Sequence, residues 1–540
     1  MEPGATSNAP KTRLVQWPWY PFVVAIYPLW FLYLSNSGQA SLATVLDATT
    51  VALAATLVLL WLAGKLTASI RIGALVVTVI IVCFYAYGPL HDFAVRLAVH
   101  RPHSQFLRAI GQIFENHVAL SSLLLGLLAF LIWLIVVRAD RNSTRVTGAC
   151  NVAAATLGAI LLTRVLLGSM DSLGDGVKHD RAVTGAGNKT SVLGYNPDIY
   201  YIILDGYARA DVLRDYYDFD NGPFIAGLKR RGFTVNDRSS ANYNHTFLSL
   251  ASSLNFDYLQ DIATETLDDP EMLVKRRGFA KIAELLQDNR AAHFLRARGY
   301  RFVHLQSSSP ETVRNPYADE QVSCAGRVFD DEYFRAVAEI SWLKALAPES
   351  MVTDDLAECH NLRLQALGNQ ASRPGPKFVF AHFMPPHHPY LFDKDGNVLR
   401  KATISNQFDY QARLWEDKSG YLGQLQYLNT SVTEVVDRIL AQSKQPPIII
   451  VQSDHGPNLR DGLSIEQMHF LRLANFAAYF LPGAPPGTLP ADCAPVNQFR
   501  YLFNHYFAAE LPVLPFRSFF SEFKTPLQMT ELPPSATGQP

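Results

Sequence analysis

Five long apolar stretches in the first third of the chain constrain the fold more than any other feature. They cover residues Trp17–Leu34, Ala48–Gly64, Ile72–Leu90, Val118–Val137 and Val146–Gly168. A helix needs about 20 mostly apolar residues to cross the hydrocarbon core of a bilayer. We therefore expect residues 1–168 to form a transmembrane domain of five helices.

The first stretch is predicted to stay in the protein rather than to act as a cleaved signal peptide. It contains Pro18, Pro21 and Pro28, it lacks a cleavage site of small residues, and four more apolar stretches follow it. Basic residues concentrate on the cytoplasmic side of membrane proteins. In this chain, basic residues lie beside the span ends in three segments: Lys11 and Arg13 before the first span, Lys65 and Arg71 between the second and third, and Arg138, Arg141 and Arg145 between the fourth and fifth. This distribution places the N-terminus in the cytoplasm and everything after Gly168 outside.

The segment between the third and fourth spans also contains basic residues, namely Arg96, Arg101 and Arg108. Its apolar residues recur with helical spacing: Phe93, Leu97, Phe106, Ile110 and Ile113. This pattern predicts an amphipathic helix on the outer surface, which leaves the orientation unchanged. A further basic residue, Arg164, lies inside the last span. Its side chain either extends to the nearby outer interface or contacts an anionic lipid substrate.

The remainder of the chain has the composition of a soluble globular protein. Residues 169–195 are polar and Gly-rich and should form a linker. Residues 196–523 should form a folded domain, and residues 524–540 a loosely ordered Pro-rich tail. The net charge of the whole chain is −1. This balance excludes the strongly basic surface expected of a nucleic-acid-binding protein.

Short apolar runs alternate with helical patterns in residues 196–523. The apolar runs are Ile199–Leu204, Gly232–Val235, Arg301–Leu305, Phe378–Phe383, Ile448–Gln452 and Phe476–Leu481. The helical patterns include Asp220–Arg230, Phe247–Leu254 and Tyr421–Ser443. Continuous apolar strands between helices are typical of an α/β fold with a mostly parallel sheet covered on both faces. Such a sheet binds ligands beyond the carboxyl ends of its strands.

Two of these strands run directly into residues that can bind a metal ion. Asp205 follows Ile199–Leu204, and Asp454 and His455 come just after Ile448–Gln452. Carboxylate and imidazole ligands suit Zn, Mn or Mg. Each motif alone could be an ordinary helix cap or a chance dipeptide. Both together at strand ends of one domain predict a divalent-metal site.

A polar loop, Ser239–His245, leads into a helical pattern that begins at Thr246. A hydroxyl at a helix N-terminus lies near unpaired N–H groups and the positive end of the helix dipole, which favour an alkoxide or a bound phosphate. Thr246 is therefore the candidate nucleophile, and the alternative is an ordinary N-cap. Asn244, in the same loop, is a candidate substrate contact.

A proline-braced loop follows the strand Phe378–Phe383 and contains His387 and His388. An imidazole beside a phosphoryl group can stabilise its charge or protonate a leaving oxygen. Both histidines are therefore candidate substrate-binding residues. The alternative is a packed turn formed by the His-Pro-Tyr sequence that ends at Tyr390.

The order of these motifs resembles that of the sulfatase and alkaline-phosphatase-like superfamily. The motifs are Asp205 after a strand, Thr246 at a helix start, His387-His388-Pro389-Tyr390, and Ser453-Asp454-His455-Gly456. The chain is similar to the membrane-anchored phosphotransferases of that superfamily. These are the lipoteichoic acid synthases, the phosphoglycerol transferases of periplasmic glucans and the phosphoethanolamine transferases of lipid A, many of which have five spans before an extracytoplasmic domain.

The resemblance implies a site with one divalent metal ion, Mn, Zn or Mg. The residues that would hold it are Asp205, Thr246, Asp454 and His455. Thr246 would form a phosphothreonine intermediate, and His387 would contact the substrate. The resemblance also implies a phospholipid donor, an envelope glycan or lipid acceptor, and a bacterial cytoplasmic membrane with the catalytic domain on its periplasmic side.

Two positions depart from the pattern of these phosphotransferases. Gly206 follows Asp205 where the synthases usually have Glu-Ser, which leaves a hydrolase open. Pro-Asn-Leu-Arg follows Gly456 where the lipid A enzymes often have Glu, which disfavours a phosphoethanolamine donor. His469 and Asp461 are available for a second metal but match no established pattern.

Other functions remain open from the residues. A phosphatase or phosphodiesterase would use the same intermediate with water as the acceptor, although five spans favour transfer between membrane-associated substrates. A non-catalytic scaffold for envelope assembly would not need a complete set of metal-binding and nucleophilic residues. A sulfatase is disfavoured because the helix start offers Thr246 and no Cys or Ser in a C/S-x-P-x-R context. A transporter is disfavoured because the spans contain few polar residues.

The five cysteines indicate no structural zinc site, because none has C-x-x-C spacing. Cys83 and Cys150 lie in apolar spans, and three lie in the soluble part. In an oxidising compartment Cys324 and Cys359 could form a disulfide. The alternative is that these two and Cys493 are free buried thiols.

Overall fold

The computed structural model describes most of the chain, in two compact units. The described residues are 17–35, 42–100, 105–114, 116–138, 144–174, 190–269, 272–273, 276–309, 311–324, 332–346, 349–399 and 414–533. The first unit, here called the helical unit, comprises residues 1–177 and 331–348. The second, the α/β unit, comprises residues 178–330 and 349–540.

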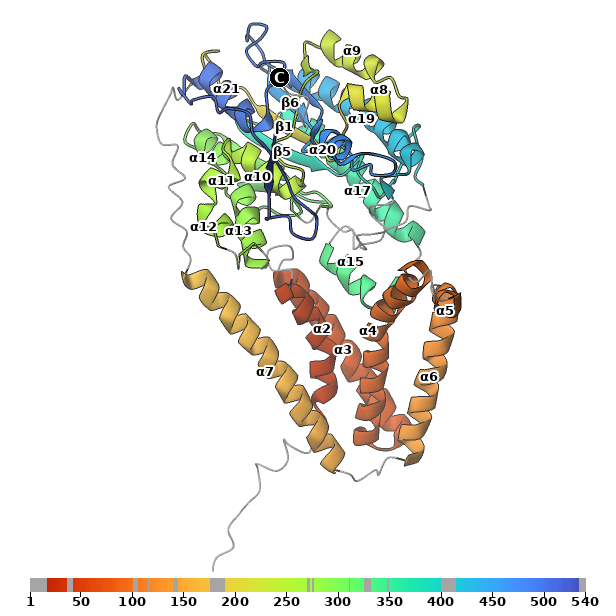
Figure 1. Ribbon diagram of the computed structural model, residues 1–540. Coiled ribbons are helices and arrows are strands. Elements are labelled where there is room, and N and C mark those ends of the chain that lie inside the picture. The colour runs from red at the N-terminus through yellow and green to blue at the C-terminus, as the bar shows by residue number, and fades with distance from the viewer. Residues whose placement is uncertain are drawn as a thin grey trace, which may run out of the picture. The chain divides into compact units, whose positions relative to one another are not determined.

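The helical unit is built from long apolar helices (Figure 1). They are α2 (Tyr20–Ser35), α3 (Leu42–Thr67), α4 (Ile70–His100), α5 (Gln105–Phe114), α6 (His117–Arg138) and α7 (Thr144–Gly174). In α3, α4, α6 and α7 the apolar stretches are long enough to cross a membrane, and that of α2, Tyr20–Leu34, is shorter. The predicted multi-pass helical domain is confirmed, and among the residues that the structure describes four helices have the full length where we expected five. The first helix is short because it begins only at Tyr20, after Pro18.

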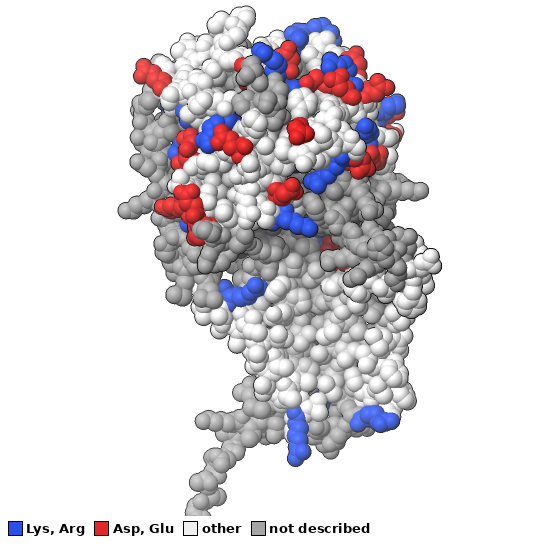
Figure 2. Space-filling view, in the orientation of Figure 1, with Lys and Arg blue, Asp and Glu red and all other residues white. Residues whose placement is uncertain are grey.

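The surface of the helical unit is apolar, as a lipid-facing surface must be. Large hydrophobic side chains such as Val51, Trp61, Phe130 and Trp133 are more than half exposed. Figure 2 shows few charged side chains on the visible face of this unit, in contrast to the α/β unit. An exposed apolar surface of this extent is a liability in water but not in a bilayer.

The segment after the third predicted span differs in part from the expectation. Helix α4 continues to His100, and the amphipathic part is a separate helix, α5, on which Phe106 and Ile113 are exposed. The guanidinium of Arg164 lies 4.8 Å from the centre of the Phe31 ring, at cation–π distance. Other residues used to predict the topology lie outside the described residues: Lys11, Arg13, Arg101, Arg141 and residues 175–189 of the expected linker.

A short insertion from the later part of the sequence belongs to the helical unit. Its helices are α15 (Glu332–Glu339) and α16 (Leu343–Leu346). The ring of Trp342 stacks on Tyr87 of α4 at 5.7 Å, and its indole Nε1 donates a hydrogen bond to Ser121 Oγ at 3.1 Å. The sequence predicted that residues 196–523 form one domain. In the structure, residues 331–348 belong to the helical unit instead.

The core of the α/β unit is a seven-stranded sheet with the strand order β2-β7-β6-β1-β5-β3-β4. The strands are β1 (Ile199–Leu204), β2 (Thr234–Asn236), β3 (Arg301–Leu305), β4 (Glu320–Val322), β5 (Lys377–Phe383), β6 (Ile448–Gln452) and β7 (Ala477–Phe480). The pairs β6-β1, β1-β5, β5-β3 and β3-β4 are parallel, and β7 is antiparallel to β6 and β2. The predicted mostly parallel sheet is confirmed. Only the short edge strand β4 was not predicted.

Helices cover both faces of this sheet (Figure 1). One face packs against α10 (Thr246–Asn255), α13 (Arg276–Gln287), α14 (Arg290–Arg296) and α21 (Pro495–Phe507). The other packs against α8 (Ala210–Tyr217), α9 (Gly222–Arg230), α17 (Glu349–Asn369) and α19 (Lys418–Gln442). Every residue of β1, β5 and β6 is buried. Burial on both faces explains why these strands are continuous apolar runs.

The end of the chain is more ordered than its composition predicts. Strands β8 (Ser518–Phe520) and β9 (Thr530–Leu532) form an antiparallel hairpin, and Leu527 between them is 2% exposed. The first part of the expected loose tail is therefore folded, because Leu527 reaches the core. Residues 534–540 lie outside the described part of the chain.

A disulfide joins Cys324 and Cys359 with a Cα–Cα distance of 5.6 Å. This is the predicted pair, and it brackets the insertion that packs with the helical unit. Cys493 is a buried free thiol in the α/β unit.

Candidate metal centre and nucleophile

The carboxyl ends of the three central strands bring the predicted site residues together. Strand β1 lies between β6 and β5, with Ile203 opposite Gln452 and Leu204 opposite Phe383. The residues just beyond these positions are Asp205, Ser453 and Met384. Because parallel strands end at one edge of a sheet, the loops after β1, β6 and β5 meet there.

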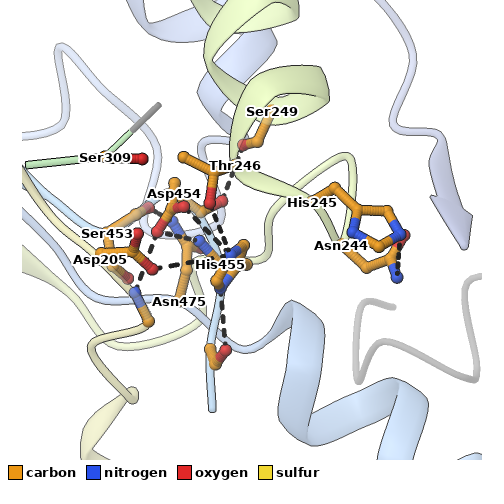
Figure 3. A network of polar contacts seen from close by, with 12 residues as sticks. Asp205, Asn244, His245, Thr246, Ser249, Ser309, Ser453, Asp454, His455 and Asn475 are labelled. Carbon is orange, nitrogen blue, oxygen red and sulfur yellow. Dashed lines mark hydrogen bonds and ion pairs between the residues drawn. The ribbon is translucent and has the colours of Figure 1, made fainter. Parts of the chain in front are cut away.

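Asp205, Asp454 and His455 each offer a ligand atom, and these atoms all lie within 4.8 Å of one another. Nε2 of His455 is 3.1 Å from Asp454 Oδ2 and 3.8 Å from Asp205 Oδ1. The three side chains are at most 2% exposed. Figure 3 shows them pointing toward one another, with Thr246 directed at the same point from its helix.

Two carboxylate oxygens in this cluster are buried and accept no hydrogen bond: Asp205 Oδ1 and Asp454 Oδ2. The other oxygen of Asp454 accepts from the backbone N–H groups of Gly206 at 3.0 Å and His455 at 2.9 Å. Burial of an unpaired carboxylate oxygen is costly. A divalent cation removes that cost, and two carboxylates with an imidazole are suitable ligands for Zn or Mn. The residues therefore fit the predicted metal ion.

The ionisation of the two carboxyl groups is coupled. Burial acts to raise the pKa of Asp205, but the imidazoles of His387 and His382 outweigh it and hold this pKa below its ordinary value. Burial and the nearby Asp205 carboxylate raise the pKa of Asp454. One proton is thus favoured on the pair in the absence of a cation, and a bound cation would replace it.

Arg472, in α20 (Ile465–Leu473), supplies a positive charge beside the cluster. Its Nη2 lies 2.9 Å from His455 Nε2, its Nη1 donates to Gly456 O at 3.0 Å, and its Nε donates to Asn244 O at 2.9 Å. Burial and this guanidinium hold the pKa of His455 well below its ordinary value. His455 is therefore neutral at physiological pH, which is the form that binds a metal.

Thr246 is the first residue of α10, and its hydroxyl does not cap the helix. The N-cap position is His245, without a side-chain hydrogen bond to the helix. The Thr246 hydroxyl instead lies 3.2 Å from His455 Nε2, and the residue is only partly buried. Ser249, one turn later, donates to the carbonyl of Asp454 at 2.7 Å and fixes the helix against the loop after β6. This geometry favours the nucleophile interpretation of Thr246 over the capping interpretation.

Two glycines allow the backbone to close around the cluster. Gly206 has φ +66°, and a Cβ atom there would lie 2.6 Å from Cη2 of Trp415. A Cβ atom on Gly456 would lie 2.0 Å from the carbonyl oxygen of Leu471. The Gly206 that departs from the family pattern is therefore required locally, by backbone conformation and by the position of Trp415.

The two predicted substrate-binding histidines lie in the loop after β5. The backbone N–H of His387 donates to the carbonyl oxygen of Asp205 at 3.2 Å, which places this loop beside the metal-binding cluster. Both imidazoles pack on Trp415, at 4.9 Å and 5.6 Å between ring centres. His387 is partly exposed, whereas His388 is 4% exposed. Burial, the His387 imidazole and Arg472 lower the pKa of His388 to about 2, so His388 cannot donate a proton at neutral pH.

Asn244, the third predicted substrate contact, has a structural partner. Its amide group binds the backbone of Ser521 in both directions, at 2.9 Å and 3.0 Å. Figure 3 shows Asn244 and His245 apart from the carboxylate pair. His469 stacks on Phe520 at 4.2 Å. Among the described residues the only group suited to a metal is Asp205, Asp454 and His455, so His469 and Asp461 form no second one.

Sequence reasoning missed three residues of this site: His382, Trp415 and Arg472. His382 lies within an apolar strand, where it reads as an ordinary core residue. Arg472 lies in the last turn of an unremarkable helix, 17 residues after His455. No local pattern signals any of them. Their positions beside the cluster follow only from the packing of β5, α20 and the loop before α19.

Solved structures that match the chain at low TM-scores include a periplasmic domain, an integral membrane protein and a sulfatase. The C-terminal periplasmic domain of EcEptC from Escherichia coli matches with a TM-score of 0.39 and 12% identity, over 63% of this chain and 94% of that chain. The lipooligosaccharide phosphoethanolamine transferase A from Neisseria meningitidis matches with a TM-score of 0.36 and 11% identity, over 87% of this chain and 88% of that chain. A 2-O GAG sulfatase matches with a TM-score of 0.35 and 13% identity, over 64% and 75%.

These likenesses are too distant to indicate a substrate. No curated protein matches the chain by sequence. The sequence model of the sulfatase family does match, over residues 197–492. That range contains all the strands of the seven-stranded sheet, the cluster of Asp205, Asp454 and His455, and Thr246. The chain therefore belongs to the sulfatase family.

Proposed function

We propose that this protein is a membrane-bound, metal-dependent phosphotransferase. It would transfer a phospho-substituent of the phosphoglycerol or phosphoethanolamine type from a membrane lipid to an envelope glycan or lipid. The observation that carries the proposal is the convergence of the Thr246 hydroxyl with Asp205, Asp454 and His455. These residues come from loops far apart in the sequence, and a purely structural domain has no need to bury them together.

Asp205, Asp454, His455 and Thr246 would hold one divalent cation, Mn, Zn or Mg. When bound, such a cation acts as a Lewis acid that lowers the pKa of a hydroxyl and stabilises negative charge on a phosphoryl group. The carboxylates fix the charge of the site. His455 is kept neutral by Arg472 and by burial, so that its Nε2 lone pair is available.

Thr246 would act as the nucleophile. Its Oγ would give up its proton to water and form a bond to the phosphorus of the donor headgroup, the bond from phosphorus to the diacylglycerol oxygen would break, and that oxygen would take up a proton. The acceptor hydroxyl then attacks the same phosphorus, gives up its proton, and restores the free Thr246 hydroxyl. His387 is partly exposed, its imidazole is near enough to lower the pKa of Asp205, and it would donate the proton to the leaving oxygen.

Arg472 would bind the phosphoryl oxygens. Its Nη2 now faces the lone pair of His455 Nε2. Because that lone pair is the one that binds the cation, metal binding would free this N–H for another acceptor. Burial lowers the pKa of Arg472 to about 10, so the guanidinium stays cationic at neutral pH. A forked cation of this kind matches a phosphoryl group well.

The membrane helices favour transfer over hydrolysis, because one anchor would suffice for an enzyme that releases its product to water. A sulfatase nucleophile would have to be a Cys or Ser at the position of Thr246. The free Cys493 packs in the hydrophobic core under the sheet instead. Sulfate-ester hydrolysis is therefore the least favoured activity, although the domain is of the sulfatase family.

We place the protein in the bacterial cytoplasmic membrane with a cytoplasmic N-terminus and the α/β unit outside. The basic residues at the helix ends, such as Lys65, Arg71 and Arg138, support this orientation. The Cys324–Cys359 disulfide supports an oxidising compartment for the α/β unit.

The test is phosphate labelling of Thr246. Purified full-length protein is incubated with Mn or Zn and a phospholipid carrying a labelled phosphoglycerol or phosphoethanolamine headgroup, and the labelled residue is identified by mass spectrometry. We expect label on Thr246 and none in Thr246→Ala. Thr264→Ala is the matched control, because Thr264 is also the first residue of a helix, α12 (Thr264–Leu267), and is exposed.

Each alternative gives a different result. Release of the free headgroup phosphate to water without an acceptor indicates a hydrolase. An unchanged envelope in cells that carry Asp454→Asn indicates a scaffold. Absence of any label on Thr246 with either lipid and either metal contradicts the proposal.

A further inference from the structure

His382 is a buried histidine of β5 that lies behind Asp205. It pairs in register with Ile203 of β1, two residues before Asp205. Its Nε2 lies 3.4 Å from Asp205 Oδ2, is buried and has no hydrogen-bond partner that satisfies normal geometry. His382 is outside the group of ligand atoms that lie within 4.8 Å of one another. Its ring therefore approaches the carboxylate of Asp205 and not the centre of the cluster.

A chain of hydrogen bonds holds the other ring nitrogen. The backbone N–H of Ser309 donates to Ser307 Oγ at 2.8 Å, Ser307 Oγ lies 2.7 Å from Thr312 Oγ1, and Thr312 Oγ1 lies 2.6 Å from His382 Nδ1. Ser307, Thr312 and His382 are at most 2% exposed. The turn that contains Thr312 is also fixed, because its carbonyl oxygen lies 2.9 Å from His304 Nε2.

The N–H at one end of this chain and the carboxylate at the other together favour one direction of donation. A backbone N–H can only donate, so Ser307 Oγ acts as an acceptor toward Ser309 and can give its own hydrogen to Thr312. Thr312 then gives its hydrogen to His382 Nδ1, and the ring proton is left on Nε2. If His382 Nδ1 instead donated to Thr312, the unprotonated Nε2 of His382 would face the carboxylate of Asp205, and its lone pair would repel that oxygen.

We propose that His382 is a positioning residue whose Nε2–H attracts Asp205 Oδ2 across the 3.4 Å contact and so presents Asp205 Oδ1 to the cation. The inference rests on the proposed metal site and adds a residue that orients one of its ligands. The pairing explains why Asp205 Oδ2 lies near a donor while Asp205 Oδ1 accepts no hydrogen bond. A metal-binding carboxylate that is held in this way binds through one oxygen and loses no free energy to reorientation.

The experiment measures metal binding, not turnover. Full-length protein in nanodiscs is titrated with Mn²⁺, and the free ion is followed by EPR at constant pH. We expect His382→Leu to weaken Mn²⁺ binding by about 10- to 100-fold, the range found for residues that orient metal ligands. Thr312→Val, which removes the hydroxyl that orients the ring, should act in the same direction. His382→Gln, which can keep an N–H donor, should recover part of the affinity.

A buried histidine elsewhere serves as the matched control. His360 in α17 is 4% exposed and packs between Phe383 and Phe392. His360→Leu should leave Mn²⁺ affinity unchanged, so that a general effect of replacing a buried imidazole is separated from the specific one. Thermal unfolding of each variant identifies a protein that has lost its fold. If His382→Leu does not fold, the Mn²⁺ affinity of Thr312→Val is used to test the inference.

Electron spin echo measurements on the Mn²⁺ form distinguish positioning from direct ligation. We expect nitrogen coupling from one imidazole, lost in His455→Ala and retained in His382→Leu. Nitrogen coupling that persists in His455→Ala and disappears with His382→Leu would make His382 a ligand and overturn the inference. Unchanged Mn²⁺ affinity in both His382→Leu and Thr312→Val would also overturn it. Failure of the unmodified protein to bind Mn²⁺ or Zn²⁺ would instead contradict the proposed metal-dependent function itself.

Discussion

The hydroxyl oxygen of Thr246 lies 3.2 Å from Nε2 of His455, although 209 residues separate the two in the sequence. One residue begins the helix that packs on one face of the sheet, and the other follows the central strand β6. The same nitrogen is approached by Arg472 from α20. The proposed nucleophile, a proposed metal ligand and a cationic side chain thus meet at the edge of the sheet.

The first prediction concerns the role of Arg472. Arg472→Gln should lower the rate of phosphoryl transfer by about 10²- to 10³-fold, the usual effect of removing one donor that stabilises a transition-state charge. Affinity for Mn²⁺ should not fall, because a positive charge beside the cation is removed. Comparison of transfer rates with Mn²⁺ titrations separates the two effects. Arg214→Gln, at an exposed side chain of α8, is the control and should change neither.

The second concerns Gly206. Gly206→Ala should destabilise the protein by about 1–3 kcal/mol, since a left-handed conformation and a clash with Trp415 act together. The same change displaces the N–H that binds Asp454, so Mn²⁺ affinity should also fall. Gly462→Ala is the matched control, with φ +75° and no atom within 4 Å of the added Cβ. Equal unfolding temperatures for both variants would contradict the prediction.

The third concerns pH. Burial and Asp205 raise the pKa of Asp454 above its ordinary value of 3.8, so the folded metal-free protein binds a proton there that the unfolded chain has released. Stability of the metal-free protein should therefore fall as the pH rises above about 4. Metal affinity should change in the opposite sense, because the cation competes with this proton.

Thermal unfolding in chelator and Mn²⁺ titrations across this pH range check both trends. Asp454→Asn should remove the contribution of this group to the pH dependence of the metal-free protein. A metal-free protein whose stability rises with pH in step with that of Asp454→Asn would contradict the assignment.

The fourth concerns the insertion in the helical unit. Gly88 lies under α15, and a Cβ atom there would come 1.9 Å from the carbonyl oxygen of Glu339. Gly88→Val should displace the insertion and expose residues 331–348 to protease in detergent. Trp342→Ala should act in the same direction, because it removes the packing of the indole on Tyr87 and its hydrogen bond to Ser121. Leu346→Ala, at a side chain that is 69% exposed, is the control. Protease resistance equal to that of the unmodified protein would show that the insertion does not depend on these contacts.

Much of the architecture could be predicted from local patterns. The apolar stretches identified α3, α4, α6 and α7, and the runs at Ile199–Leu204 and Ile448–Gln452 matched strands β1 and β6 to the residue. Both signals are strong because every residue of the segment is in an apolar environment. For the membrane helices this environment is lipid, and for the central strands it is the protein core on both faces of the sheet. Strands β4 and β9 lack that signal, since their residues are only partly buried or exposed. Strand β8 is buried at Ser518 and Phe519, but three residues are too few to form a recognisable apolar run.

The sequence by itself determined which residue types follow the strands, and hence that Asp205, Asp454, His455 and Thr246 could act together. Only the tertiary structure decided how they are supported. It placed Arg472 against His455, His382 against Asp205, and Asn244 against Ser521. It also assigned residues 331–348 to the helical unit. These choices depend on contacts between segments far apart in the chain, and local periodicity contains no information about which of many compatible surfaces will meet.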